Sequence, residues 1–102
     1  MRILIGTTPQ DGHVNPLTAL ARALLAAGHE VLWYTGRAYE PKVTALGATF
    51  FPFEQAWDID IDQLDTLFPD RANYKGMAQL KYDLRNFFIP NLEKQSADLL
   101  AL

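Results

Sequence analysis

Alternating apolar runs and polar, glycine-punctuated turns divide the first half of the chain into strands and helices. Residues 2–6 form an apolar run that is typical of a strand buried on both faces. Helical spacing then links the apolar residues Leu17, Leu20, Ala21, Leu24 and Leu25. Residues 30–35 and 48–52 are predicted strands, with a short helix at residues 39–46 between them. This order predicts an α/β fold, half of a Rossmann-like parallel sheet flanked by helices and joined by right-handed crossovers.

Glycines are placed to end both predicted helices. Gly28 follows the first and Gly47 the second, where each can adopt the left-handed conformation that commonly closes a helix. We therefore expect each helix to turn sharply back into the next strand.

The pattern changes after Phe53. Residues 54–73 carry no sustained period, and we expect a long irregular loop there, with room for a turn of helix. Helical spacing returns from Tyr74, and we expect a break near Ile89 and Pro90 before a second helical stretch. With three strands in the order 3-2-1, the first strand would form an apolar sheet edge, which predicts that the chain is the beginning of a larger protein.

Composition narrows the classes of function. Twelve acidic against nine basic residues give a net charge of -3, so there is no basic field for nucleic acid. No apolar run approaches the roughly 20 residues that cross a bilayer. Met1 leads directly into the first strand, which leaves no room for a secretory leader, and cysteine is absent. We expect a cytoplasmic protein.

His13 lies between the first strand and the first helix, where parallel α/β sheets place their chemistry. Asn15 followed by Pro16 has the pattern of an N-cap with proline at the first helical position, so we expect the helix to begin there. An imidazole in such a crevice can act as a general base, which contributes ~10²–10⁴-fold to a rate. The structural alternative is a loop histidine that hydrogen-bonds to the backbone.

The neighbours of His13 are candidate substrate-binding residues. Gly12 would let a substrate approach the backbone, or it is a turn glycine that needs a positive φ. Asp11, two residues before His13, either orients the imidazole or is a turn residue, and Asn15 serves mainly as the N-cap. His29 is expected at the opposite end of the sheet as a cation that follows a helix C-terminus.

The second half offers two further groups of side chains. An apolar acceptor pocket or an ordinary core would account for Trp57, Phe68, Met77, Phe87 and Phe88. The aspartates between Asp58 and Asp70 lack the glycine and closing glutamate of a calcium loop, so we predict a solvated surface and no metal site.

Several segments together resemble the opening of a GT-B fold glycosyltransferase. They are residues 2–6, 12–17, 21–24, 27–31 and 46–48, and the likeness runs from Met1 to about Phe53. The chain is most similar to bacterial enzymes that glycosylate macrolides, other polyketides and flavonoids with UDP- or dTDP-sugars. The element of glycine, histidine, two residues and proline that begins at Gly12 is the most informative of these.

The resemblance implies an inverting, metal-independent sugar transfer to a hydroxyl of a small hydrophobic acceptor, with His13 as the general base. An aspartate after a fourth strand would orient that base, and a second Rossmann-like domain would hold the nucleotide sugar. On this interpretation residues 1–102 are a partial N-terminal acceptor-binding domain, without the fourth strand onward and without the C-terminal donor domain. No cofactor is implied.

Two other classes of function stay open. A dinucleotide-binding Rossmann module is disfavoured because the first turn lacks G-x-G-x-x-G and the second strand has no acidic residue at its end. Arg37 would have to accept a 2′-phosphate instead. A non-catalytic interaction fragment would use the exposed first strand to pair with a partner or with a second copy.

Overall fold

The computed structural model of the protein describes residues 1–59 and 63–102. These residues form two compact units, Met1–Phe53 and Glu54–Leu102. The boundary coincides with the predicted change of pattern after Phe53. Within the described ranges, no helix is both long and apolar enough to cross a lipid bilayer.

A three-stranded parallel sheet organises the first unit. Its strands are β1 (Arg2–Gly6), β2 (Glu30–Thr35) and β3 (Thr49–Pro52), in the order β1-β2-β3. Ile5 pairs with Trp33 in register, so their side chains share one face of the sheet. The predicted α/β class and the predicted strand order are confirmed.

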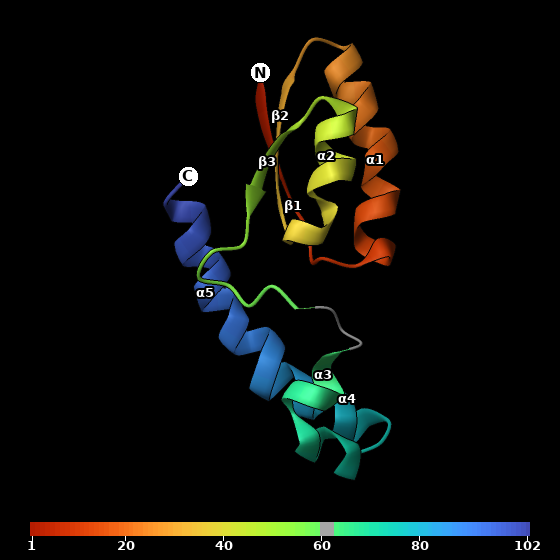
Figure 1. Cartoon of the computed structure of the whole chain (residues 1–102), viewed down its shortest axis with the longest axis vertical. Coiled ribbons are helices and arrows are strands. Elements are labelled where there is room, and N and C mark those ends of the chain that lie inside the picture. Colours follow the sequence, from red (N-terminus) through yellow and green to blue (C-terminus); the bar gives the residue numbers. More distant parts are fainter. Residues whose placement is uncertain (60–62) are drawn as a thin grey trace. The chain divides into compact units, whose positions relative to one another are not determined.

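Both long connections of this unit cover the same face of the sheet. These are α1 (Asp11–Ala26) and α2 (Glu40–Leu46), the latter entered through a 3₁₀ turn, η1 (Arg37–Tyr39) (Figure 1). Between the helices and the sheet lies a core of seven buried residues: Ile5, Val14, Ala21, Val31, Trp33, Val43 and Ala48. Of the predicted apolar stripe of α1, Ala21 belongs to this core and Leu17, Leu24 and Leu25 pack against it, whereas Leu20 is 49% exposed.

The predicted helix ends are confirmed. Gly28 follows α1 with a φ of 89°, and its N–H bonds to the carbonyl of Leu25 at 3.0 Å. The N–H of His29 reaches back to the carbonyl of Leu24 at 3.1 Å, which completes a Schellman motif. Gly47 ends α2 in the same left-handed region, with a φ of 95°.

The predicted start of α1 is wrong. The helix begins at Asp11 with Gln10 as its N-cap, and Pro16 lies inside it. The carbonyl of Gln10 accepts the N–H groups of His13 at 3.0 Å and Val14 at 2.9 Å. Val14 lies in the first turn and is fully buried in the core, so burial of its side chain favours a helix that includes this turn. The sequence carried this signal, because Val14 continues the apolar stripe of the later helix by one turn.

Short helical elements make up the second unit. They are α3 (Leu64–Leu67), a 3₁₀ segment η3 (Pro69–Asn73), α4 (Met77–Asp83), a π-helical segment η4 (Leu84–Phe88) and α5 (Ile89–Leu100). The expected irregular loop over residues 54–73 thus contains a turn of α-helix and a 3₁₀ segment. The expectation of a turn of helix there is confirmed.

The expected break near Pro90 is a wider helical turn instead. Leu84 and Ile89 both keep right-handed helical dihedrals, with φ of -62° and -67°. Pro90 has no N–H to donate, and the i→i+5 pattern of η4 lies immediately before it. The helical course therefore continues through the proline by a local change of pitch.

Candidate functional site

The loop after β1 is held firmly against β2. The N–H of Thr7 extends the strand pairing to the carbonyl of Tyr34 at 3.0 Å. The indole N–H of Trp33, itself fully buried, donates to the Thr7 hydroxyl at 3.0 Å. These two bonds place the start of α1 at the carboxyl ends of the parallel strands, the edge at which open α/β sheets bind ligands.

His13 is the third residue of α1 and is exposed. Its place within the helix, instead of in a loop before it, corrects the sequence-based expectation. No hydrogen bond joins its imidazole to any residue in the described part of the chain. The ring is therefore available to a ligand, at a helix N-terminus and at the functional edge of the sheet.

Asp11 is engaged away from His13. Its carboxylate accepts a hydrogen bond from the hydroxyl of Tyr39 at 2.9 Å. As the first residue of α1, it also complements the positive end of the helix dipole. The pair ties the start of α1 to η1, and no hydrogen bond joins Asp11 to His13 in the described part of the chain.

Gly12 adopts ordinary helical geometry. Among the described glycines only Gly28, Gly47 and Gly76 have a positive φ, so the alternative of a strained turn glycine at Gly12 is wrong. A Cβ built on Gly12 would meet no atom within 4 Å. Pro16, four residues on, offers no N–H to the Gly12 carbonyl. The backbone at Gly12 is thus open to an approaching molecule.

Asn15 is not the N-cap. It is the fifth residue of α1, and its side-chain oxygen accepts a hydrogen bond from the ammonium group of Lys42 at 2.5 Å. Its backbone carbonyl accepts the hydroxyl of Thr18 at 2.7 Å. Asn15 therefore links α1 to α2, a contact between residues far apart in the sequence that spacing alone does not indicate.

His29 lies just before β2, at the amino end of the sheet. The parallel strands run from this edge to the edge of His13. The expected separation of the two histidines is therefore confirmed.

The aromatic residues of the second unit pack on one another. Phe87 is buried, with its ring centroid 5.9 Å from that of Trp57, 6.3 Å from Phe68 and 4.9 Å from Phe88. Met77 does not share this cluster's burial, since 68% of it is exposed. Phe87 is the buried centre of this cluster, whereas Trp57 is 36% exposed, and an acceptor contact of any of its members stays a prediction.

Two buried polar residues of α5 were missed by the sequence analysis. The carboxylate of Asp98 accepts three consecutive backbone N–H groups at 2.7–3.1 Å, those of Glu54, Gln55 and Ala56. The side-chain amide of Asn91 brackets Trp57, accepting from its N–H at 2.7 Å and donating to its carbonyl at 3.4 Å. Asn91 and Asp98 lie two helical turns apart on one face of α5, and this spacing of two polar residues could have indicated a shared role. They fix the segment that enters the second unit.

Arg71 joins two of the acidic residues. It makes a bidentate contact with Asp83, at 2.6 and 3.0 Å, and a further bond to Asp65 at 2.7 Å. The hydrogen bonds to Asp83 and then Asp65 raise the pKa of Arg71 above its ordinary value. Asp65 is paired with Arg71 and still has 65% of its side chain exposed, in agreement with the expected solvated surface. Asp58 and Asp70 are exposed as well, while Asp60 and Asp62 lie outside the described residues.

Comparisons with known proteins agree on a single class. The chain is 40% identical over 101 residues to 4'-demethylrebeccamycin synthase of Lentzea aerocolonigenes, covering 99% of the chain and 24% of that protein. It is 36% identical over 96 residues to UDP-glucosyltransferase A1 of Starmerella bombicola, covering 93% of the chain and 21% of that protein. No family model matches the chain.

A solved structure gives the same result. The glycosyltransferase SsfS6 of Streptomyces sp. SF2575 superimposes with a TM-score of 0.52 and 39% sequence identity, over 63% of the chain and 18% of that protein. The same enzyme has also been crystallised with thymidine diphosphate. The chain spans about a quarter of the length of its curated relatives or less. In sequence and in fold, the chain is homologous to part of the GT-B glycosyltransferases.

Proposed function

We propose that the chain is the N-terminal, acceptor-side part of an inverting glycosyltransferase that moves a hexose from a nucleotide sugar to a hydroxyl of a small hydrophobic acceptor. The observation that carries this proposal is the exposed, unbonded imidazole of His13 at the N-terminus of α1. It lies where the loop after β1 opens onto the ligand-binding edge of the sheet.

In this mechanism His13 is the general base. Its imidazole takes the proton of the acceptor hydroxyl while that oxygen attacks the anomeric carbon from the face opposite the leaving group. The bond from the anomeric carbon to the nucleoside diphosphate breaks in the same step, and the configuration inverts. The open backbone at Gly12 gives the acceptor room to approach the imidazole.

We assign the donor to a UDP- or dTDP-sugar held by a second Rossmann-like domain, without a metal ion. A relative is named a UDP-glucosyltransferase, and a structural neighbour has been crystallised with thymidine diphosphate. Because Asp11 is bonded to Tyr39, an aspartate outside this chain is the proposed partner that orients His13. A cytoplasmic location belongs to the same proposal.

A dinucleotide-binding module is the weaker alternative. In such modules the pyrophosphate lies at the N-terminus of the first helix. Here the carboxylate of Asp11 occupies the first position of α1, where it would repel a pyrophosphate. Binding of NAD(P) in preference to UDP- and dTDP-glucose would reverse this assignment.

The test replaces His13 in a protein that also carries a donor-binding domain. Either a longer gene product that contains this sequence or a chimera serves, in which the chain replaces the matching segment of the Lentzea relative. For His13→Ala we expect kcat to fall by ~10²–10⁴-fold, since the base is lost. The affinity for the nucleotide sugar, measured by calorimetry, stays within twofold, roughly the error of such a comparison.

His29→Ala is the matched control, because it removes the same side chain at the far edge of the sheet. It should leave kcat unchanged. Near wild-type turnover by His13→Ala would refute the proposed role of His13.

A further inference from the structure

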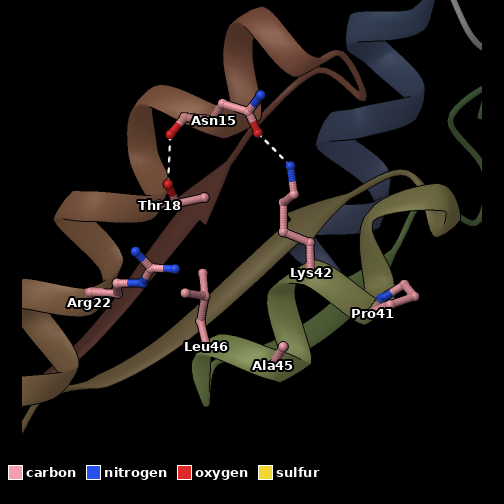
Figure 2. Close-up of a pocket in the computed structure, with 7 residues that line it drawn as sticks. All are labelled: Asn15, Thr18, Arg22, Pro41, Lys42, Ala45 and Leu46. Atoms are coloured by element: carbon pink, nitrogen blue, oxygen red, sulfur yellow. Dashed lines mark hydrogen bonds between the residues drawn. The ribbon is translucent and has the colours of Figure 1, made fainter.

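A groove lies between α1 and α2 on the outer surface of the first unit (Figure 2). Its volume is about 650 Å³, within the range of small-molecule sites. The lining residues are Asn15, Thr18, Arg22, Pro41, Lys42, Ala45 and Leu46. Neither His13 nor Gly12 is among them, so the groove is separate from the proposed catalytic position.

The charges in this groove are all positive. Arg22 and Lys42 line it from the two helices, and no acidic residue does so. Arg22 makes no hydrogen bond or ion pair with any residue that the structure describes. Lys42 donates to the neutral side-chain oxygen of Asn15, which uses one of its three N–H groups. The Lys42 ammonium group also lies 6.0 Å from the centre of the Tyr39 ring. Among the described residues, neither cation thus has a carboxylate partner, in a chain whose net charge is -3.

The remaining lining is mainly apolar. Thr18 has already committed its hydroxyl proton to the carbonyl of Asn15, so it cannot donate to a ligand. Leu46 projects between Arg22 and Lys42, with Ala45 beside it on α2 (Figure 2). A ligand that suits this groove therefore needs an anionic group for the cations and an apolar part for Leu46.

We propose that the groove between α1 and α2 binds a small organic anion, with its phosphate or carboxylate between Arg22 and Lys42 and its apolar part on Leu46. Arg22 supplies a planar fork of donors and Lys42 a compact charge, the pair of groups that anion sites commonly use. The groove is open to solvent, so we expect dissociation constants on the order of a millimolar.

The test is a titration of the ¹⁵N-labelled chain, followed by its amide spectrum. Phenyl phosphate and phenylacetate distinguish the two anionic groups, inorganic phosphate lacks the apolar part, and benzyl alcohol lacks the charge. Binding of phenyl phosphate or phenylacetate should shift the amides of α1 and α2 around Arg22 and Lys42. Inorganic phosphate should bind more weakly and benzyl alcohol not at all. Shifts confined to the second unit, or equal shifts with benzyl alcohol, would overturn the proposal.

Substitutions assign the binding to the cations. Arg22→Gln and Lys42→Gln should each weaken binding about tenfold, as expected for one lost charge-assisted contact. Lys75→Gln removes the same charge from an exposed lysine of the second unit and should leave the affinity unchanged. If Lys75→Gln weakens binding equally, the attraction is a general charge effect and the proposal fails. Should Arg22→Gln not fold, Arg22→Lys replaces it, with binding several-fold weaker because the fork is lost.

Discussion

Gly12 combines ordinary helical geometry with open space around it, so its contribution to stability and its proposed role in function can be separated. A methyl group there would meet no atom within 4 Å. Because alanine favours helix over glycine, Gly12→Ala should raise the free energy of unfolding by ~0.5–1 kcal/mol. In a protein with the donor domain, the same change should lower kcat/KM if the acceptor approaches this backbone. Urea denaturation and steady-state kinetics measure the two effects, and an unchanged kcat/KM would remove Gly12 from the acceptor site.

The carboxylate of Asp98, which the sequence analysis did not single out, accepts three hydrogen bonds from the backbone. Asp98 is 6% exposed and holds the three N–H groups of residues 54–56. Asp98→Ala would leave those groups without their charged acceptor, and we expect a loss of about 2–3 kcal/mol in the free energy of unfolding, measured in urea. Glu93→Ala removes an exposed carboxylate from the same helix and should cost under about 0.5 kcal/mol. Equal losses in the two variants would contradict the anchoring role.

The ends of α1 respond oppositely to the same substitution. Gly28 adopts a φ of 89° at the C-terminal end, a conformation that costs an L-residue about 1–2 kcal/mol. Gly28→Ala should therefore lower the free energy of unfolding by about 1 kcal/mol, although the added methyl group would meet no atom within 4 Å. Thermal unfolding of Gly28→Ala beside Gly12→Ala measures the contrast. A stabilised Gly28→Ala variant would show that the left-handed cap does not persist in solution.

On our proposal, the general base at His13 supplies only part of the catalysis of the full enzyme. General base catalysis accounts for roughly 3–5 kcal/mol of barrier lowering. Alignment of the donor and stabilisation of the departing diphosphate come, on our proposal, from a second domain. The 102-residue chain alone should therefore transfer no sugar from UDP- or dTDP-glucose to any acceptor. Turnover that is present in the wild-type chain and absent in His13→Ala would disprove this.

Among the described residues, β1 lies at an open edge of the sheet. Within the described residues β1 pairs only with β2, and Leu4 is 48% exposed while Ile5 is buried. An open strand edge with an apolar side chain favours association between copies. Light scattering at micromolar concentration should show oligomers, and Leu4→Lys should reduce them. A wild-type chain that stays monomeric would argue against association through the edge of β1.

Features that depend on residues close together in the chain could be predicted from the sequence alone. The bounds of β1 and β2 agree with their apolar runs, because such runs mark strands locally. The expectation that β1 is buried on both faces is wrong for the described residues, since α1 and α2 cover one face of the sheet (Figure 1) and Leu4 is 48% exposed. Gly28 and Gly47 end their helices as predicted, since a left-handed residue is a local requirement that glycine meets at little cost. The place of His13 at the carboxyl end of β1 follows from the same local order of strand and helix.

Contacts between side chains that are far apart in the chain became visible only in the folded protein. Burial of Val14 against the sheet starts α1 before Asn15, against the local N-cap pattern. Asp11 pairs with Tyr39, which is 28 residues away, instead of with His13, and Asp98 binds N–H groups more than 40 residues before it. Apolar burial and buried hydrogen bonds between distant residues outweigh the weaker local preferences of caps and turns, and a single sequence does not state those distant pairings.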